Sequence, residues 1–255
     1  MNQTDPSVTG PSWRQVSIQF DAWEAAEHTG VTHLGPIMTV AEATGLVASW
    51  FFIRKAPCWR LRFLPPDDST AHEATTFVHR RLDTLRDADS IGPWVETRYE
   101  PETYAFGGSA AMDIAHHLFH QDSRHILTYL GSDRATASAD AGGRRRELSI
   151  LLCSILMRAA GQDWYEQGDI WARVSEHRSL PPDAQLDRLH GMESDLQQLM
   201  TVDAGSLVTD NGPLAFVSDW TAAFDSAGTE LGDLARSGLL RRGLRAVLAH
   251  HVIFA

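Results

Sequence analysis

Cysteine and lysine are the scarcest reactive and charged residues of this 255-residue chain. The two cysteines, Cys58 and Cys153, form no CxxC or zinc-ribbon pattern, which excludes a disulfide scaffold and a cysteine-built metal site and is typical of a reducing compartment. Lys55 is the only lysine, so every other basic side chain is an arginine, the residue that binds carboxylates through two parallel hydrogen bonds. The placing of individual arginines therefore matters.

Long apolar runs, a signal sequence and an excess of basic charge are missing as well. No apolar stretch reaches the roughly 18 residues that span a bilayer, and the N-terminus lacks a basic segment followed by an apolar one. The formal charge of −11 repels a phosphate backbone, which argues against direct binding of nucleic acid. We therefore expect a cytoplasmic protein that does not associate with membranes.

Strand patterns come early in the chain and helix patterns come late. Period-two alternation predicts strands over residues 13–20 and 58–63. A β-branched and aromatic run predicts another strand over 46–55, and WVETRY (94–99), which stops before Pro101, is a fourth candidate. Helical spacing predicts helices over residues 69–88, 109–131, 144–160, 163–178, 182–201, 213–235 and 238–254. This order predicts an α+β fold, with an early, mostly antiparallel sheet packed against a C-terminal layer of helices. We expect a flexible arm over 1–12 and a single domain over 13–255.

Two arginines lie two residues apart in the predicted strand CWRLRF (58–63). Because residues i and i+2 of a strand project from one face, Arg60 and Arg62 are expected to lie side by side, near Arg54 on the preceding strand. Neighbouring guanidinium groups repel each other unless an anion lies between them, which indicates a carboxylate or phosphate site. A solvated pair balanced by acidic side chains is the alternative.

The segment RYEPETYAFGG (98–108) ends a strand at a proline and introduces a helix through two glycines. Tyr99 and Tyr104 flank Glu102, whose carboxylate could take part in acid–base chemistry. Carboxylates near a helix start are also commonly solvated and stabilised by the helix dipole. The residues alone leave both interpretations open.

Histidines provide two further candidates. His116 and His120 have the i, i+4 spacing of zinc ligands, but the HExxH pattern and a third ligand are missing, so no metal site is predicted. His250 and His251 end an amphipathic helix at the C-terminus. A histidine titrates near neutral pH and can serve as a general acid or base, although a structural role is common.

Four segments resemble one protein family in the same order: WFFIRKAPCWRLRF (50–63), RYEPETYAFGG (98–108), HHLFHQDSRHIL (116–127) and RRELSILLCSILMRAAGQDWYEQGDIWARV (145–174). They resemble the thiopeptide-type bacteriocin biosynthesis proteins, stand-alone relatives of the C-terminal elimination domain of lantibiotic dehydratases. The resemblance extends from about Trp13 to the C-terminus and is densest over 46–178. It implies a role in the maturation of ribosomally made peptides.

In that dehydratase system a large protein transfers glutamate from glutamyl-tRNA to Ser or Thr of a precursor peptide. The small protein then eliminates the glutamate to leave a dehydroamino acid. The resemblance implies that Arg60 and Arg62 bind the glutamyl carboxylates and that His250 or His251 is the catalytic base. From their places in the chain, we expect Arg54, Tyr99 and Tyr104 as further substrate ligands and Glu102 as a further catalytic residue. The resemblance implies no cofactor. It implies a precursor peptide and a large glutamylating subunit as partners, and it leaves a homodimer open.

Two departures from the family pattern keep other functions open. Ala105 stands where related elimination domains carry the arginine of an ERYGG stretch, and the chain ends in HHVIFA where a histidine motif is usually followed by Asn-Arg. Related pyridine synthases join two dehydroalanines in a formal aza-[4+2] cycloaddition, which needs no arginine for glutamate. A third function, in another class, is a non-catalytic scaffold that binds the leader peptide or the large subunit through a sheet edge. We place elimination first because Arg60 and Arg62 are present.

Overall fold

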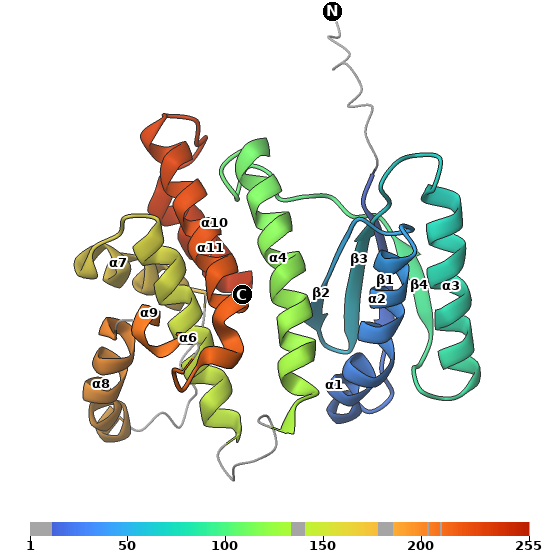
Figure 1. The fold of residues 1–255 in the computed structure, drawn as a ribbon, viewed down its shortest axis with the longest axis horizontal. Helices are drawn as coiled ribbons and strands as arrows, with labels where there is room; N and C mark the ends of the chain where they lie inside the picture. Colours follow the sequence, from blue (N-terminus) through green and yellow to red (C-terminus); the bar gives the residue numbers. More distant parts are fainter. Residues whose placement is uncertain (1–11, 134–140, 178–185, 203, 210, 255) are drawn as a thin grey trace, which may run out of the picture. The chain divides into compact units, whose positions relative to one another are not determined.

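The chain divides into two compact units in a computed structural model, which describes residues 12–133, 141–177, 186–202, 204–209 and 211–254 (Figure 1). Unit 1 extends to Glu100 and also includes Ile126–Gly131. Unit 2 comprises Pro101–His125 and the chain from Ser132 onward. Apart from Ser12, the arm predicted over 1–12 lies outside the described residues.

A four-stranded antiparallel sheet forms the centre of unit 1. Its strands are β1 (Arg14–Gln19), β2 (Ser49–Lys55), β3 (Cys58–Leu64) and β4 (Trp94–Thr97), in the spatial order β2-β3-β1-β4. All neighbouring strands are antiparallel, and β2 and β3 form a hairpin through Ala56 and Pro57. Each of the four predicted strands is thus observed at its expected place in the chain.

Helices cover one face of this sheet within unit 1 (Figure 1). A continuous helical stretch consists of η1 (Trp23–Ala25), α1 (Ala26–Thr29), η2 (Gly30–Leu34) and α2 (Gly35–Ala43), and α3 (Ala71–Asp87) follows the hairpin. Buried side chains of α2 and α3 join those of β1 and β3 in one apolar core, whose members include Met38, Val78, Leu82, Ile18 and Leu61. Burial of each such side chain contributes about 2 kcal/mol to stability.

Unit 2 is helical in its described residues. Its helices are α4 (Ser109–Leu130, whose last turn and a half belongs to unit 1), α6 (Ala141–Ala159), α7 (Trp164–Ser175), α8 (Leu186–Thr201), α9 (Ala204–Leu207), η3 (Ala215–Val217), α10 (Ser218–Arg236) and α11 (Leu244–Phe254). The buried indole of Trp220 on α10 donates a 2.8 Å hydrogen bond to Asp122 on α4. Burial raises the pKa of the Asp122 carboxyl to about 7.

The observed elements confirm the predicted α+β class. Strands end at Thr97, and the chain beyond Gly108 is helical wherever it forms regular structure in the described residues. Among those residues, no helix combines the length and the apolar character needed to cross a membrane.

Candidate functional site

The loop before α4 is locked against the segment that leads into α11. Gly107 and Gly108 have φ angles of 97° and 114°, a backbone conformation that glycine adopts without strain. A Cβ atom at Gly107 would lie 2.9 Å from Cγ2 of Val247, so this position also has no room for a side chain. The backbone N–H of Arg241 donates to the carbonyl of Gly107 at 2.8 Å. The paired glycines thus bring residues 101–108 close to the C-terminal helix.

This approach joins two of the residues expected at the site. Nε2 of His250 on α11 and Oε2 of Glu102 lie 2.9 Å apart, although 148 positions separate them in the sequence. Only 18% of the His250 side chain is exposed, against 54% for Glu102. The ring of Phe106 packs edge-to-face on the imidazole, with 4.5 Å between ring centroids. The result is a histidine held between an aromatic wall and an accessible carboxylate.

Its surroundings keep His250 neutral at neutral pH. Burial lowers the pKa of His250, and the charge and hydrogen bond of Glu102 oppose this. The guanidinium of Arg242 and the neighbouring His177 lower the pKa further. The Glu102 carboxylate can only accept a hydrogen bond, so Nε2 of His250 carries the proton and donates it. In the neutral imidazole, the free lone pair is therefore on Nδ1. Nδ1 has no hydrogen-bond partner in the described part of the chain. This nitrogen can accept a proton from a bound molecule.

His251 has a different environment from its neighbour. The side chain is fully buried, and its Nδ1 donates to the carbonyl of Val247 one turn earlier in α11 at 2.9 Å. Burial lowers the pKa of His251 to about 4. The adjacent histidines predicted as catalytic candidates therefore divide into one partly accessible and one enclosed imidazole.

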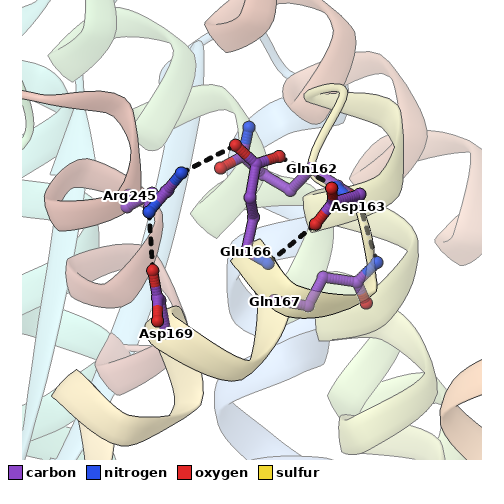
Figure 2. Close-up of polar contacts among 6 residues, drawn as sticks. All are labelled: Gln162, Asp163, Glu166, Gln167, Asp169 and Arg245. Atoms are coloured by element: carbon purple, nitrogen blue, oxygen red, sulfur yellow. Dashed lines mark hydrogen bonds and ion pairs between the residues drawn. The ribbon is translucent and has the colours of Figure 1, made fainter.

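A charged network ties α11 to α7 and so holds His250 in place. Arg245 forms ion pairs with Glu166 at 2.8 Å and Asp169 at 2.6 Å, as Figure 2 shows. Asp163 caps α7 by accepting from the backbone N–H of Glu166 at 2.9 Å, and the Glu166 carboxylate accepts in return from the N–H of Asp163. This capping box is the S/T/D-x-x-E arrangement that stabilises a helix start.

In unit 1, Arg62 lies on the sheet face opposite the apolar core. It is 8% exposed, and its Nε donates to Oε1 of Gln15, directly across on β1, at 2.7 Å. Its guanidinium carbon lies 4.1 Å from the ring centroid of Tyr99 and 5.1 Å from that of Phe51. Arg62 and Tyr99, both predicted to bind substrate, are thus in direct contact with each other.

The other predicted substrate ligands are dispersed. Arg54 pairs with Trp59 in the register of β2 and β3, which puts it on the face opposite Arg60 and Arg62, and it forms an ion pair with Glu27. Arg60 is half-buried on the same face as Arg62. Tyr104, in unit 2, is exposed. The sheet register therefore keeps Arg60 and Arg62 on one face, as predicted, and separates Arg54 from them.

Sequence reasoning missed Arg242, whose Nη1 donates to the carbonyl of Ala105 at 3.1 Å. The signal was the run RRGLR (241–245) just before the terminal helix, but its spacing does not indicate which residues of unit 2 it meets. Within the described ranges, no three His, Cys, Asp or Glu side chains gather in a way that could hold a metal ion.

Comparison with known proteins matches nearly the whole chain to one family. The model for "Lantibiotic biosynthesis dehydratase C-term" matches residues 13–253. The tRNA-dependent lantibiotic dehydratase MibB from Microbispora sp. 107891 is 18% identical with a TM-score of 0.65, over 99% of this chain and 26% of MibB. TsrL is 19% identical with a TM-score of 0.54, over 89% of this chain and 67% of TsrL. No match was found among curated proteins.

These two structural likenesses, at identities below one fifth, establish a shared fold. The chain spans about a quarter of the length of MibB.

Proposed function

Because this chain belongs to the lantibiotic biosynthesis dehydratase C-terminal family, whose role is the maturation of lantibiotic-type peptides, we propose that it eliminates glutamate from glutamylated Ser or Thr of a precursor peptide. The observation that carries the proposal is the hydrogen bond between His250 and Glu102. It supplies an oriented, neutral imidazole, which is the kind of base that removal of an α-proton requires.

The proposed reaction is a β-elimination in which atoms and charges balance. Nδ1 of His250 takes the proton from Cα of the glutamylated residue, and the electron pair of that C–H bond forms the Cα–Cβ double bond. The bond between Cβ and the ester oxygen breaks, and glutamate leaves as a carboxylate. Glu102 accepts the Nε2–H and stabilises the imidazolium that forms.

The proposal includes two partners. We assign the preceding glutamyl transfer to a large glutamylating subunit, which would also bind the transfer RNA. The precursor peptide is the shared substrate. The formal charge of −11 is consistent with leaving RNA binding to the other subunit.

The test is mass spectrometry of a synthetic peptide that carries a glutamyl-serine ester, incubated with the purified protein. We expect loss of glutamate and formation of dehydroalanine. His72→Gln, which changes an exposed histidine on α3, serves as the matched control for His250→Gln. An ester that survives with the wild-type protein, with and without the large subunit, would contradict the proposal.

Cycloaddition is the second candidate, and Ala105 favours it because this position has a methyl group where elimination domains carry an arginine. A peptide with two suitably spaced dehydroalanines tests it in the same assay. Its conversion to a pyridine macrocycle with leader release would establish cycloaddition. Binding of either peptide without any reaction would favour a scaffold.

A further inference from the structure

Arg242 is an arginine without a counter-charge beside the His250–Glu102 pair. Its Nη1 donates to the carbonyl of Ala105, a neutral acceptor, and in the described residues it forms no ion pair. The residue is half-buried, so part of its surface is accessible. A guanidinium has five N–H donors, and most of those on Arg242 are left for another acceptor.

The fold fixes this guanidinium near the proton acceptor. The backbone N–H of the preceding residue, Arg241, donates a hydrogen bond to the carbonyl of Gly107. The helix that follows, α11, carries His250 about two turns further along the chain. After burial, which is the main cause, the charge of Arg242 also lowers the pKa of His250. Glu102, the nearby carboxylate, is engaged by His250.

Arg245, three residues later in the same segment, differs from Arg242 in having counter-charges. It forms ion pairs with Glu166 and Asp169, which neutralise it within the protein (Figure 2). An arginine held by one neutral carbonyl keeps its charge for an incoming anion. Carboxylates match the planar fork of a guanidinium, and glutamate bound as an ester still has a free carboxylate.

We infer that Arg242 binds the free carboxylate of the esterified glutamate and holds the substrate against His250 and Glu102. This inference rests on the proposed function for the identity of the carboxylate. The backbone carbonyl of Ala105 orients the guanidinium, so residue 105 needs no charged side chain of its own. Arg242 thus acts as a substrate-binding residue that positions the ester for attack.

The direct test uses a probe that cannot react. Glutarate, a dicarboxylate with the carbon skeleton of glutamate, is titrated into protein with labelled histidines while NMR follows the imidazole of His250. We expect glutarate to shift this signal and its neutral analogue glutaramide to leave it unchanged. Arg242→Gln should weaken glutarate binding about tenfold or more, because a charge-assisted hydrogen bond is lost.

Two variants separate binding from a general structural effect. Arg242→Lys keeps the charge and should restore part of the affinity. Arg241→Gln removes an adjacent, exposed guanidinium while its backbone bond to Gly107 stays, and it should bind glutarate like the wild type. Arg242→Gln should also raise the pKa of His250 in the absence of any ligand, a change that loss of packing alone does not predict. The neighbours Glu102, His177 and His251 are common to all these proteins.

With the glutamyl peptide as substrate, Arg242→Gln should raise KM about tenfold and change kcat less, since it removes binding that ground state and transition state share. Glutarate affinity that is unchanged in Arg242→Gln, or reduced equally in Arg241→Gln, would overturn the inference. Glutarate binding that depends on Arg242 in a protein unable to release glutamate would refute the proposed function and leave the carboxylate site standing.

Discussion

Arg62 in unit 1 and Arg242 in unit 2 both donate to neutral oxygens, yet their settings differ. Arg62 is almost enclosed, with Gln15 on one strand and the ring of Tyr99 against its face. Arg242 lies at a half-buried position beside a histidine and an exposed carboxylate. A buried cation needs partners within the protein because its desolvation is costly, whereas a partly exposed cation can keep hydrogen-bond donors available for a ligand. Accessibility rather than residue type distinguishes the two arginines.

The largest expected effect is on the proton acceptor of unit 2. His250→Gln should lower the rate of glutamate elimination about 10³-fold, because general-base catalysis contributes on that order. Single-turnover mass spectrometry measures the rate, and thermal unfolding verifies the fold of the variant. An equally active His250→Gln protein would move the search for the base to another residue.

Stability should distinguish the two arginines next. Arg62→Met should lower the free energy of unfolding by about 2 kcal/mol, because Gln15 and the ring of Tyr99 lose a charged partner. Arg242→Gln should stay within about 0.5 kcal/mol of the wild type, as is usual away from the core. Urea unfolding of the three proteins gives both values. An Arg62→Met protein that is stable but inactive would support Arg62 as the substrate ligand that the sequence suggested.

A loss of stability of similar size is expected where the loop meets α11. Gly107→Ala combines a φ of 97° with a Cβ that would lie 2.9 Å from Val247, so it should destabilise by about 2 kcal/mol and weaken elimination. Gly238→Ala is the matched control, since its φ is 67° but nothing lies within 4 Å of the new Cβ. It should cost about 1 kcal/mol and leave activity intact. Equal losses in both variants would mean that the contact with Val247 does not matter.

The finest effect is the pH dependence of elimination. The rate should rise with pH as His250 becomes neutral, through a pKa that burial has lowered. Glu102→Gln removes the charge that favours the imidazolium, so the acid limb of kcat/KM should move to lower pH. Arg242→Gln removes a charge that disfavours it, so this limb should move to higher pH. If the acid limbs of both variants shift in the same direction, or do not shift, the group that titrates in this limb is not His250.

Local patterns predicted much of this fold because the forces behind them act over a few residues. Alternation in WRQVSIQF (13–20) and CWRLRF (58–63) predicted which side chains of β1 and β3 share a face. The two glycines before α4 indicated a break between the strand and the helix. The same patterns could not show that Arg54 lies on the face opposite Arg62, because that depends on the register of a hairpin turn.

The sequence by itself determined the α+β class, the family and a set of candidate residues that contains both members of the His250–Glu102 pair. Tertiary structure alone decided that these two side chains meet and that His251 is buried. It also decided that Arg242 donates a hydrogen bond to the backbone carbonyl of Ala105. The physical reason is the distance along the chain: 148 positions separate Glu102 from His250, and 137 separate Ala105 from Arg242. Periodicity carries no information over such spans, whereas the packing of whole helices does.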